Sequence, residues 1–377
     1  MSRVILIGTV ASSFYGFRAD LIAMLLKRGH QIYAFTSEYT DIDLKKIESL
    51  GAIPITYELN RGGLNPFSDI IATYNLSKKI RKIKPDLVFS YFSKPVIFGT
   101  IAAKLAKTPK VIGMLEGLGY TFTEQPEGLS KKTKLIKKLQ ILLYKISLPQ
   151  LDKLIFLNPD DPLDLINKYS INIKKTEVLG GIGLNLKEYS YQPMTIIQQP
   201  INFLFIGRLL KEKGIHDFLA AAKIVKEKYP ETQFTVLGAI DPHNLGALTQ
   251  SELHELISSN IIHYLGHVNN VKDWIANSHV FVLPSYREGV PRSTQEVMAI
   301  GRAVITTDVP GCRETVQNCV NGFLVPKWNP KALAEKMIYF IEHPEQIEKM
   351  GYESYKIAQD KFDADKVNQR LLNILGL

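Results

Sequence analysis

Short apolar runs alternate along this chain with segments of helical periodicity, and this alternation constrains the fold more than any other feature. Runs at residues 4–7 and 31–35 flank a helical segment at 20–27, and a loop is expected at 8–17. Parallel strands need a crossover connection to return the chain, and a helix is the usual one. The pattern therefore predicts an α/β fold built on parallel sheets.

The alternation is interrupted once and then restarts, which predicts two domains. Further elements of the first half are expected as strands near 53–57, 87–90, 111–114 and 153–157 and as helices near 69–83 and 96–106. Glutamines and prolines at 192–193 and 198–200 then have the composition of a linker. A new strand follows at 201–206. A chain of 377 residues is long enough for two such domains. We predict two Rossmann-like domains, over residues 1–192 and 193–355.

Composition excludes several classes of protein. The chain is 45% hydrophobic and 22% charged, as ordinary globular proteins are. Its two cysteines, Cys312 and Cys319, form neither a disulfide framework nor a metal-ligand pattern, which indicates a reducing cytosol. We expect no export signal, because strand residues follow Met1 almost at once. We also expect no membrane-spanning helix, because no apolar run approaches about 18 residues.

Positive charge is concentrated in the first half of the chain. Residues 1–200 contain 27 Lys and Arg against 17 Asp and Glu, a net charge of +10, whereas residues 201–377 contain 19 against 20. The N-terminal domain is therefore expected to meet an anionic partner. A membrane surface, a pyrophosphate-bearing substrate and nucleic acid all fit this charge.

The segment at 280–301 carries the strongest functional signal. Its apolar start predicts a buried strand, which a proline ends. A helix is expected from about residue 292, because Pro291 suits the approach to a first turn, where a missing N–H costs nothing. Glu288 then lies on the loop before the helix, and Glu296 lies about one turn inside it. A helix N-terminus attracts anions, and carboxylates beside it can accept hydrogen bonds from sugar hydroxyls.

This segment resembles the E-x7-E motif of retaining glycosyltransferases of family 4, which have the GT-B fold. Glu288 and Glu296 are separated by seven residues, Gly289 follows the first, and the match continues through 301–311 and Glu314. The resemblance implies two Rossmann-like domains that face a central cleft, with a last helix at 356–377 that crosses back to the first domain. The implied activity is retaining, metal-independent transfer of a hexose or N-acetylhexosamine from a nucleotide diphosphate sugar, without a cofactor.

The resemblance also assigns roles in donor binding. Glu288 is expected to bind hydroxyls of the donor sugar, and Glu296 the ribose. Arg208 and Lys213 lie on a glycine-flanked loop after the strand at 201–206, where two cations can stabilise charge on a leaving diphosphate. Further donor contacts are expected from Gly207, from the backbone at Gly289, Val290, Pro291 and Arg292, and from His267 and Val268 at the nucleotide base.

Patterns that mimic metal sites are set aside. His263 and His267 are four apart on a strand and its loop, so they do not share a face, and no third ligand is near. The D-x-D sequences at 41–43 and 363–365 lie near expected helix starts, and we interpret them as helix acids. We therefore expect no metal.

Acceptor contacts are expected at strand ends of the N-terminal domain. Lys94 follows the strand at 87–90 and is a candidate phosphate contact, and Gly16 and Arg18 lie at the end of the first loop. For Arg18, a surface arginine at a helix end fits the sequence equally well. Glu116 lies in a glycine-rich strand-end loop where many family members have a histidine that faces the donor sugar. We transfer no histidine role and expect Glu116 to bind acceptor or donor hydroxyls.

Residues 130–148 predict a basic amphipathic helix. Its apolar residues recur at helical spacing (Leu135, Leu139, Leu142 and Ile146), and lysines are interleaved among them (Lys131, Lys132, Lys134, Lys137, Lys138 and Lys145). Such a helix either lies on anionic lipid headgroups or is an ordinary domain helix with a solvated lysine face. The charge asymmetry favours the membrane, where each lysine contributes about 1 kcal/mol.

The resemblance, with the charge distribution, implies transfer of a hexose or N-acetylhexosamine to a polyprenyl-diphosphate-linked sugar in bacterial surface glycan assembly. The first candidate that the resemblance suggests is N-acetylgalactosamine, from UDP-N-acetylgalactosamine and in α linkage. The Glu-Gly-Leu-Gly sequence at 116–119 resembles a family subgroup that works on lipid carriers. We expect a peripheral protein on the inner face of the cytoplasmic membrane. The alternatives are a soluble acceptor, another GT-B enzyme such as a nucleotide-sugar epimerase or a phosphorylase, and a basic module that binds nucleic acid. The last leaves the donor-site residues unexplained, and we expect no nucleic acid partner.

Overall fold

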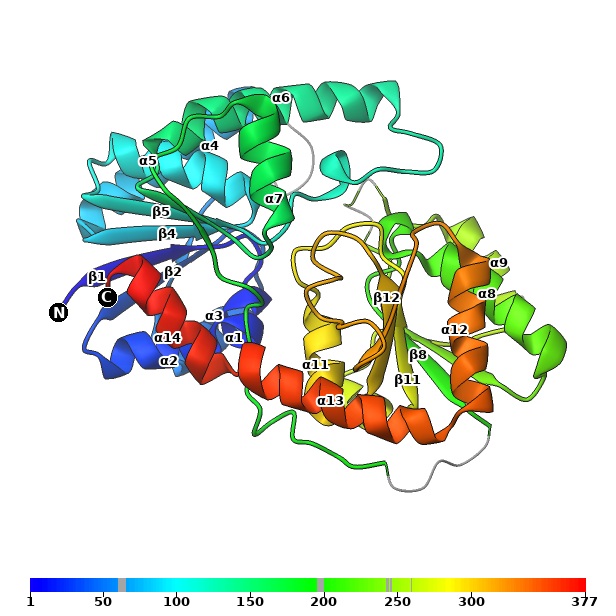
Figure 1. Ribbon diagram of the computed structural model, residues 1–377. Coiled ribbons are helices and arrows are strands. Elements are labelled where there is room, and N and C mark those ends of the chain that lie inside the picture. The colour runs from blue at the N-terminus through cyan, green and yellow to red at the C-terminus, as the bar shows by residue number, and fades with distance from the viewer. Residues whose placement is uncertain (60–65, 195–199, 242–243, 245, 259) are drawn as a thin grey trace. The chain divides into compact units, whose positions relative to one another are not determined.

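The computed structural model describes residues 1–59, 66–194, 200–241, 244, 246–258 and 260–377. These residues form two compact units, each built on one parallel sheet (Figure 1). Unit 1 comprises Met1–Thr121, Leu129–Ile182 and Asp365–Leu377, and unit 2 comprises Phe122–Gly128 and Gly183–Ala364. The prediction of two Rossmann-like domains is confirmed. Gln198 and Gln199 of the predicted linker lie outside the described residues.

Unit 1 contains a seven-stranded sheet in the order β3-β2-β1-β4-β5-β6-β7. Its strands are β1 (Arg3–Ile7), β2 (Gln31–Thr36), β3 (Ile53–Thr56), β4 (Leu87–Tyr91), β5 (Lys110–Leu115), β6 (Lys153–Phe156) and β7 (Thr176–Val178). The central strands are mostly apolar on both faces, and they are buried apart from Arg3 at the start of β1, because helices cover both sides of a parallel sheet. The sequence pattern did not indicate β7, which is only three residues long.

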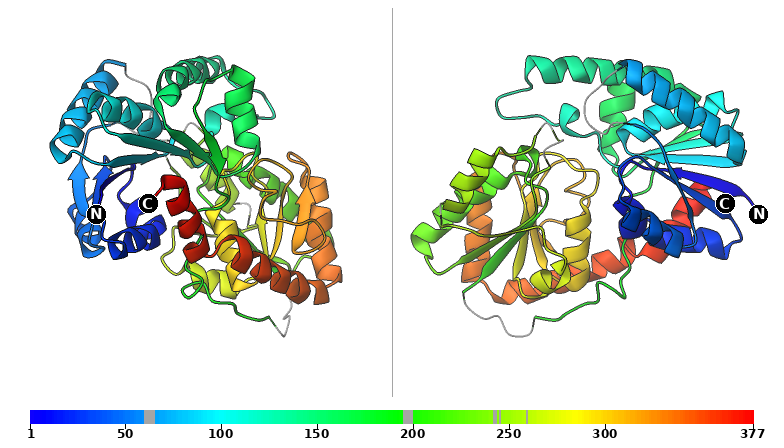
Figure 2. Two further views of the ribbon diagram at one scale, coloured as in Figure 1. Left: turned by 60° about the vertical axis from the view of Figure 1, so that its left-hand side comes forward. Right: turned by 180° about the vertical axis from the view of Figure 1, so that it is seen from behind.

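Helices of unit 1 cover the two faces of this sheet in two groups (Figures 1 and 2). One group is α1 (Ser12–Phe17), α2 (Ala19–Lys27), α3 (Asp41–Ser49) and α14 (Ala364–Leu375), and the other is α4 (Pro66–Ile83), α5 (Thr100–Leu105), α6 (Lys131–Ser147) and α7 (Asp160–Pro162). Turns of π-helix lead into α5 at Pro95–Gly99 and follow α7 at Leu163–Asn167. The expectation of a loop over 8–17 was wrong for its second half, where α1 includes Gly16.

Unit 2 contains a six-stranded sheet in the order β10-β9-β8-β11-β12-β13. Its strands are β8 (Asn202–Ile206), β9 (Gln233–Leu237), β10 (His263–Gly266), β11 (Val280–Leu283), β12 (Ala303–Thr307) and β13 (Gly322–Val325). Its helices are α8 (Ile215–Lys228), α9 (Gln250–Ser258), α10 (Val271–Ala276), α11 (Arg292–Ile300), α12 (Pro330–Glu342) and α13 (Glu345–Lys361). In Figure 1, α8 and α12 cover one face of this sheet, and α11 and α13 cover the other.

The C-terminal segment differs from the single helix predicted for 356–377. It forms α13 and α14, which are separated at Phe362 and Asp363. α14 packs on unit 1, where Lys153 Nζ donates to the carbonyl oxygen of Ile374 at 2.6 Å. Arg28, at the end of α2, donates to Gln369 Oε1 at 2.7 Å. The chain therefore ends on the unit in which it began.

Local capping explains where several of these helices begin. α3 starts with a capping box, in which Thr40 Oγ1 accepts from the N–H of Asp43 while the Asp43 carboxylate accepts from the N–H of Thr40. Ser130 caps α6 through the N–H of Thr133, and Asn329 caps α12 through the N–H of Ala332. The interpretation of Asp43 as a helix acid is confirmed.

The core of unit 2 depends on Phe218 of α8, which packs against the sheet. Its ring centroid lies 5.6 Å from that of Phe205 and 5.9 Å from that of Phe234. We expect Phe218→Ala to lower the free energy of unfolding by about 3–5 kcal/mol, because it removes buried aromatic area and leaves a cavity. Phe67→Ala is the matched control: that ring is 82% exposed, so its loss should cost within about 0.5 kcal/mol. Chemical denaturation of both variants checks this, and equal losses would contradict it.

Candidate active site

Two adjacent strands of unit 2 bring the predicted donor-site residues to one edge of the sheet. β8 and β11 are hydrogen-bonded and parallel, so their carboxyl ends lie together. Arg208 and Lys213 follow β8, and Glu288 and Glu296 follow β11. Open α/β sheets bind ligands at this edge. The fold thus assembles residues that are far apart in the sequence.

The centre of this group is an ion pair between the Lys213 ammonium and the Glu288 carboxylate. The same carboxylate oxygen accepts a hydrogen bond from Ser285 Oγ at 2.7 Å. The side chains of Lys213 and Glu288 are only 17% and 10% exposed. Burying either charge alone would be costly, so each group holds the other in place at the strand ends.

Glycines at two positions permit the close approach of loops around Glu288. Gly214 has φ +72°, and a Cβ there would lie 2.1 Å from the carbonyl oxygen of Pro284. Gly311 has φ +80°, and its Cβ would lie 2.3 Å from the backbone oxygen of Glu288. The N–H of Glu288 also donates to the carbonyl oxygen of Pro310 at 3.0 Å. The loops after β8 and β12 therefore fix the backbone that carries Glu288.

Glu296, on the first turns of α11, belongs to a second polar group. Its Oε1 accepts from Arg292 Nε at 3.0 Å and from the Tyr189 hydroxyl at 3.1 Å. Arg292 also donates to the carbonyl oxygen of Gly183. Burial raises the pKa of the Tyr189 hydroxyl, and the negative charge of Glu296 raises it further. The hydroxyl therefore keeps its proton and can donate this hydrogen bond. Glu296 is thus held in one position before any ligand binds.

The start of α11 has the geometry expected of an anion site. Pro291 is in an extended conformation directly before Arg292, and no side chain caps the first turn. Gly289, Val290 and Pro291 are all buried. Gln295 holds this backbone from inside, since its Nε2 donates to the carbonyl oxygen of Val290 at 3.2 Å.

The remaining donor-site predictions lie along the same edge. Arg208 NH1 lies 2.5 Å from Asp241 Oδ2, and the Arg208 side chain is 48% exposed. Gly207 precedes it and packs under Gly238, where a Cβ would lie 1.8 Å from the carbonyl oxygen of Gly207. His267 and Val268 follow β10, the edge strand, with β9 between them and β8. They lie at the correct end of the sheet but not beside Lys213 and Glu288.

In unit 1 the structure brings Arg18 and Glu116 together. They form an ion pair in which the two side chains are 3% and 12% exposed. The alternative that Arg18 is a surface arginine is therefore wrong. Its guanidinium lies 4.9 Å from the ring centroid of the buried Tyr91, whose hydroxyl lies 3.1 Å from Ser13 Oγ. Burial raises the pKa of Glu116, and Arg18 opposes this shift.

Lys94 is paired in a similar way. Its Nζ lies 3.5 Å from Asp69 Oδ1, and the side chains are 14% and 4% exposed. Burial lowers the pKa of Lys94, and the Asp69 carboxylate opposes this shift. The pair joins the end of β4 to the first turn of α4. Gly16, by contrast, lies on α1 with open space beside it.

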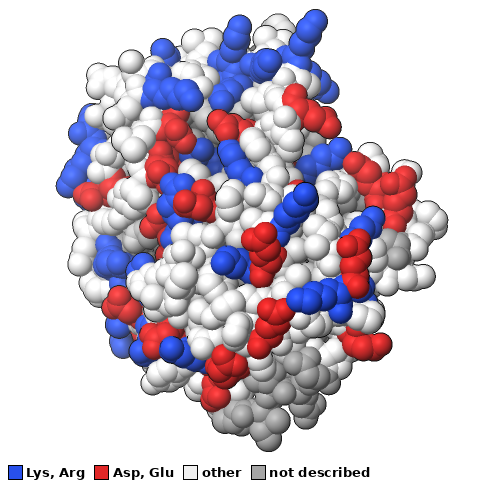
Figure 3. Space-filling view, turned by 45° about the vertical axis from the view of Figure 1, so that its right-hand side comes forward, with Lys and Arg blue, Asp and Glu red and all other residues white. Residues whose placement is uncertain are grey.

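The predicted basic helix is α6, and its orientation is unusual. Its buried side chains are Thr133, Tyr144 and Ser147, whereas Leu135 and Leu142 are 67% and 53% exposed. Lys131, Lys134 and Lys138 are also exposed, and Figure 3 shows Lys and Arg side chains projecting at the upper end of the molecule, where α6 lies. The apolar stripe therefore does not pack on unit 1. Among the described residues, no helix is both long and apolar enough to span a bilayer.

Family models match both halves of the chain. The family described as "Glycosyl transferases group 1" matches residues 192–357, and the family described as "Glycosyl transferase 4-like" matches residues 3–158. Over its full length the chain is 30% identical to N,N'-diacetylbacillosaminyl-diphospho-undecaprenol α-1,3-N-acetylgalactosaminyltransferase of Campylobacter jejuni, covering 99% of this chain and 98% of that protein. The chain belongs to the GT-B glycosyltransferases of family 4.

Other relatives of this glycosyltransferase have related names. It is 25% identical to the capsular polysaccharide biosynthesis glycosyltransferase CapM of Staphylococcus aureus, over 96% of this chain and 94% of CapM. It is 28% identical to UDP-Gal:α-D-GlcNAc-diphosphoundecaprenol α-1,3-galactosyltransferase of Escherichia coli, over 68% and 66% of the two chains.

Solved structures agree on the fold of the glycosyltransferase. Sucrose-phosphate synthase of Thermosynechococcus elongatus has a TM-score of 0.79 at 17% identity, covering 100% of this chain and 98% of that one. HepE of Anabaena, solved with UDP and glucose, has a TM-score of 0.78 at 16% identity and full coverage of both chains.

Several residues that hold the predicted site could not be assigned from the sequence. Ser285 directly follows β11, and its position at a strand end is a signal that could have identified it. Tyr189 and Asp241 lie in irregular segments, where no periodicity indicates which side chains point inward. Glu212 lies next to Lys213 in the turn before α8 and is 7% exposed. Among the described residues, no group of three His, Cys, Asp or Glu side chains is arranged to hold a metal.

Glu212 makes the stability of the enzyme depend on pH. Burial raises the pKa of its carboxyl above the ordinary value of 4.5, although Lys213 and Arg208 oppose this. The folded state then binds the proton more tightly than the unfolded state, so Glu212 lowers stability progressively as the pH rises above 4.5. We expect Glu212→Gln to unfold like the wild type at about pH 4 and to become relatively more stable towards about pH 7.

A control variant, Glu342→Gln, should change the pH dependence of stability in the opposite direction to Glu212→Gln. Lys228 lowers the pKa of the exposed Glu342, so Glu342→Gln should lose stability relative to the wild type at neutral pH and regain it in acid. Denaturation curves across this pH range measure both differences. Parallel curves for the wild type and Glu212→Gln would refute the assignment.

Proposed function

We propose that this glycosyltransferase transfers N-acetylgalactosamine from UDP-N-acetylgalactosamine, with retention and in α linkage, to a polyprenyl-diphosphate-linked sugar in bacterial surface glycan assembly. The observation that carries the proposal is the Lys213–Glu288 pair beside Ser285 and the start of α11. It combines a cation for a diphosphate with a carboxylate for sugar hydroxyls. The choice of donor and acceptor is supported by the names of the Campylobacter jejuni and Escherichia coli relatives.

The donor would bind along the carboxyl edge of the unit 2 sheet. The diphosphate would be held by Arg208, by Lys213 and by the backbone from Gly289 to Arg292. The positive end of the α11 helix dipole would add to the electrostatic attraction there. Glu288 would accept hydrogen bonds from the donor sugar and Glu296 from the ribose. His267 and Val268 would contact the base at the end of β10. Lys213 would exchange its contact with Glu288 for a phosphate oxygen.

Retention requires attack on the face from which the leaving group departs. The bond between the anomeric carbon and the diphosphate oxygen breaks, and the acceptor oxygen bonds to the same face. The acceptor proton passes to the departing phosphate, so no protein base is needed. Arg208 and Lys213 stabilise the negative charge that develops on the diphosphate. These two cations perform the role that a divalent metal has in other transferases, and we propose a reaction without metal or cofactor.

Acceptor binding is assigned to unit 1. Arg18 and Glu116 form one buried pair at the ends of α1 and β5, and Lys94 lies at the end of β4. Lys94 would contact the acceptor diphosphate and Glu116 the acceptor hydroxyls. Arg18 would act mainly by holding Glu116, and Gly16 leaves space beside α1 for the acceptor.

A lipid-linked acceptor requires contact with a membrane. The exposed lysines and leucines of α6 provide a surface for anionic headgroups. We therefore place the enzyme on the inner face of the cytoplasmic membrane as a peripheral protein, with no nucleic acid partner.

Turnover of a donor panel on a short polyprenyl-diphosphate-N-acetylglucosamine acceptor tests the activity. We expect transfer from one UDP-sugar, unchanged by EDTA, and a loss of about 100-fold or more for Glu288→Gln, which removes the charge that pairs with Lys213. The control is Glu342→Gln, which breaks an exposed Lys–Glu pair with Lys228 in the same unit and should keep full activity. If UDP binds but no UDP-sugar reacts, the proposed polyprenyl-diphosphate-linked acceptor is not the acceptor of this enzyme. Full activity of Glu288→Gln would refute the role of Glu288.

Binding to vesicles tests the role of α6. We expect the combined change of Lys131, Lys134 and Lys138 to Ala to weaken binding to phosphatidylglycerol-containing vesicles roughly 100-fold at low salt, at about 1 kcal/mol per lysine. The effect should fade at high salt as charges are screened. The same change at Lys349, Lys356 and Lys361 of α13 alters net charge equally and should have little effect. Equal losses for the two variants would show that only net charge matters.

A further inference from the structure

The first turns of α4 carry a stripe of large apolar side chains that face solvent. Phe67, Ile70, Ile71 and Tyr74 are 82%, 66%, 61% and 56% exposed. Their spacing of three, four and seven residues places them on one face of the helix. An exposed apolar group of this size normally marks an interaction surface.

The opposite face of the same turns is polar, although it is buried. Asp69, Thr73 and Ser77 point inward, and Asp69 pairs with Lys94. Thr73 Oγ1 donates to the carbonyl oxygen of Asp69 at 2.6 Å. The first turns of α4 are therefore inverted relative to a normal surface helix, whose apolar face packs on the core, as Leu76 and Ile80 do further along α4. The buried ion pair fixes this orientation, because rotating α4 to bury the stripe would leave Lys94 without the Asp69 carboxylate.

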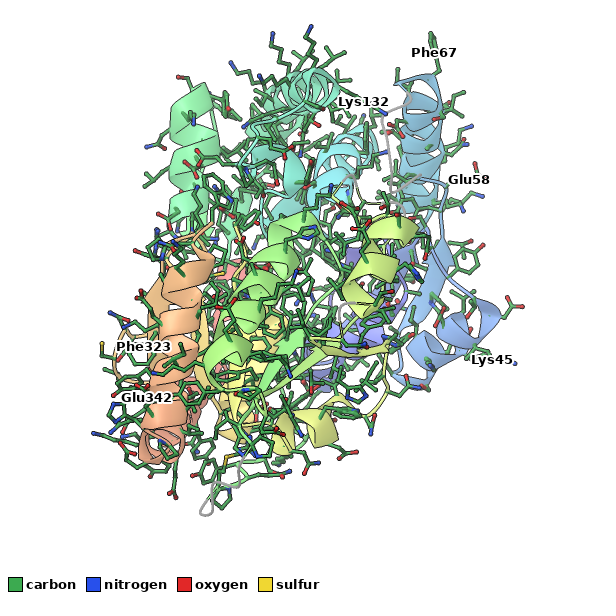
Figure 4. The ribbon with its side chains drawn as sticks, turned by 90° about the vertical axis from the view of Figure 1, so that its right-hand side faces the viewer. Lys45, Glu58, Phe67, Lys132, Phe323 and Glu342 are labelled. Atoms are coloured by element: carbon green, nitrogen blue, oxygen red, sulfur yellow. The ribbon has the colours of Figure 1, made fainter. Side chains whose placement is uncertain are left out.

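α6 is inverted in the same way and lies at the same end of unit 1. Leu135 and Leu142 are exposed, while Thr133 and Ser147 are buried together with Tyr144. Figures 1 and 2 show α6 along the upper end of unit 1, and Figure 4 shows Phe67 at that end as well, with its ring pointing away from the ribbon. Lys132 of α6 is also near this end in Figure 4, whereas Lys45 of α3 is far from it. Exposed apolar side chains of two helices thus lie at the same end of unit 1.

The chemistry along α4 changes from its tip inward. Exposure is greatest at Phe67 and falls to Tyr74. Lys78 Nζ then lies 4.4 Å from the Tyr74 ring centroid. Lys78, Lys79 and Lys82 line a depression of about 270 Å³, which Glu58 also borders. The order along α4 is thus apolar residues, an aromatic residue with a polar tip, and lysines. This order matches the change in polarity of a bilayer from its acyl boundary to its headgroups.

We propose that the N-terminal turns of α4 insert into an anionic bilayer, with Phe67, Ile70 and Ile71 at the acyl boundary, Tyr74 at the interface and Lys78 among the headgroup phosphates. The inference rests on the proposed function in that a lipid-linked acceptor requires a membrane, but it concerns residues outside the catalytic group. α6 supplies electrostatic attraction and α4 supplies apolar insertion. The Asp69–Lys94 pair then connects the inserted turn directly to the predicted acceptor contact.

The test compares two triple variants of matched chemistry. Phe67→Ser/Ile70→Ser/Ile71→Ser removes one aromatic and two isoleucines from the stripe. Tyr39→Ser/Ile42→Ser/Ile53→Ser removes one aromatic and two isoleucines that are 45%, 67% and 38% exposed around α3 and β3 of the same unit. Binding of each to phosphatidylcholine vesicles with phosphatidylglycerol is measured at low and high salt.

We expect the stripe variant to bind roughly tenfold or more weakly than the control triple, by the same factor at both salt concentrations, because apolar insertion is not screened. In Phe67→Trp, brominated lipids should quench fluorescence more strongly than in the wild type. Turnover on a water-soluble acceptor should be unchanged in the stripe variant, while turnover on a vesicle-embedded acceptor should fall.

Three results would overturn the proposal: equal binding of the two triple variants, a loss that disappears at high salt, or a change of oligomeric state in the stripe variant, which would show that a second copy covers α4. Vesicle binding needs no donor or acceptor. If no sugar is transferred under any condition but the stripe variant still loses vesicle binding, the proposed activity fails and the insertion of α4 stands.

Discussion

The site of unit 2 depends on one ion pair, between Lys213 and Glu288, at the carboxyl ends of two neighbouring parallel strands. Neither charge is stable alone at this degree of burial, so the pair constrains the loops after β8 and β11 together. Similar ion pairs recur at other candidate site residues. Arg208 faces Asp241, Arg292 faces Glu296, and in unit 1 Lys94 faces Asp69. Each pair thereby orients its cation without ligand. A diphosphate that bound Arg208 and Lys213 as we propose would have to replace a carboxylate at each of them, which would favour exchange of donor and product over very tight binding.

Backbone approach is the second constraint on the donor site. Gly214 and Gly311 bring two loops within contact distance of the segment that carries Glu288, at positions where a side chain would collide with backbone oxygens. Gly214 also ends the turn that presents Lys213 and begins α8. The ion pair and the glycines therefore depend on each other: without close loops the charges would not meet, and without the pair the loops would bury uncompensated charges.

The fold and the placement of the candidate donor-site residues were predictable because their signals are local. Apolar runs identified most strands, and the carboxyl-end rule placed Lys213 and Glu288 together. What the sequence could not show was how side chains are partnered. Arg18 is far from Glu116 in the chain, and only the folded structure brings the end of α1 to the end of β5, since β4 lies between β1 and β5 in the sheet. Asp241 and Tyr189 lie in irregular segments that have no periodicity. The loop over 8–17 was mispredicted because its residues are aromatic and small, without the spacing that indicates a helix such as α1.

The inverted helices show why helical periodicity alone does not reveal orientation. The spacing of Leu135 and Leu142 predicts an apolar face but not whether it packs on the protein, and α6 buries the opposite side. The same holds for Phe67, Ile70 and Ile71 on α4. Burying a large apolar side chain stabilises a fold by about 1.5–3 kcal/mol, so exposing several of them forgoes much of the net stability of a domain. At the start of α4 polar residues occupy the inner face instead, and the Asp69–Lys94 pair holds these turns in place. Folding stability does not account for this arrangement, whereas the proposed insertion of α4 into a bilayer would, because it would complete the burial of these side chains.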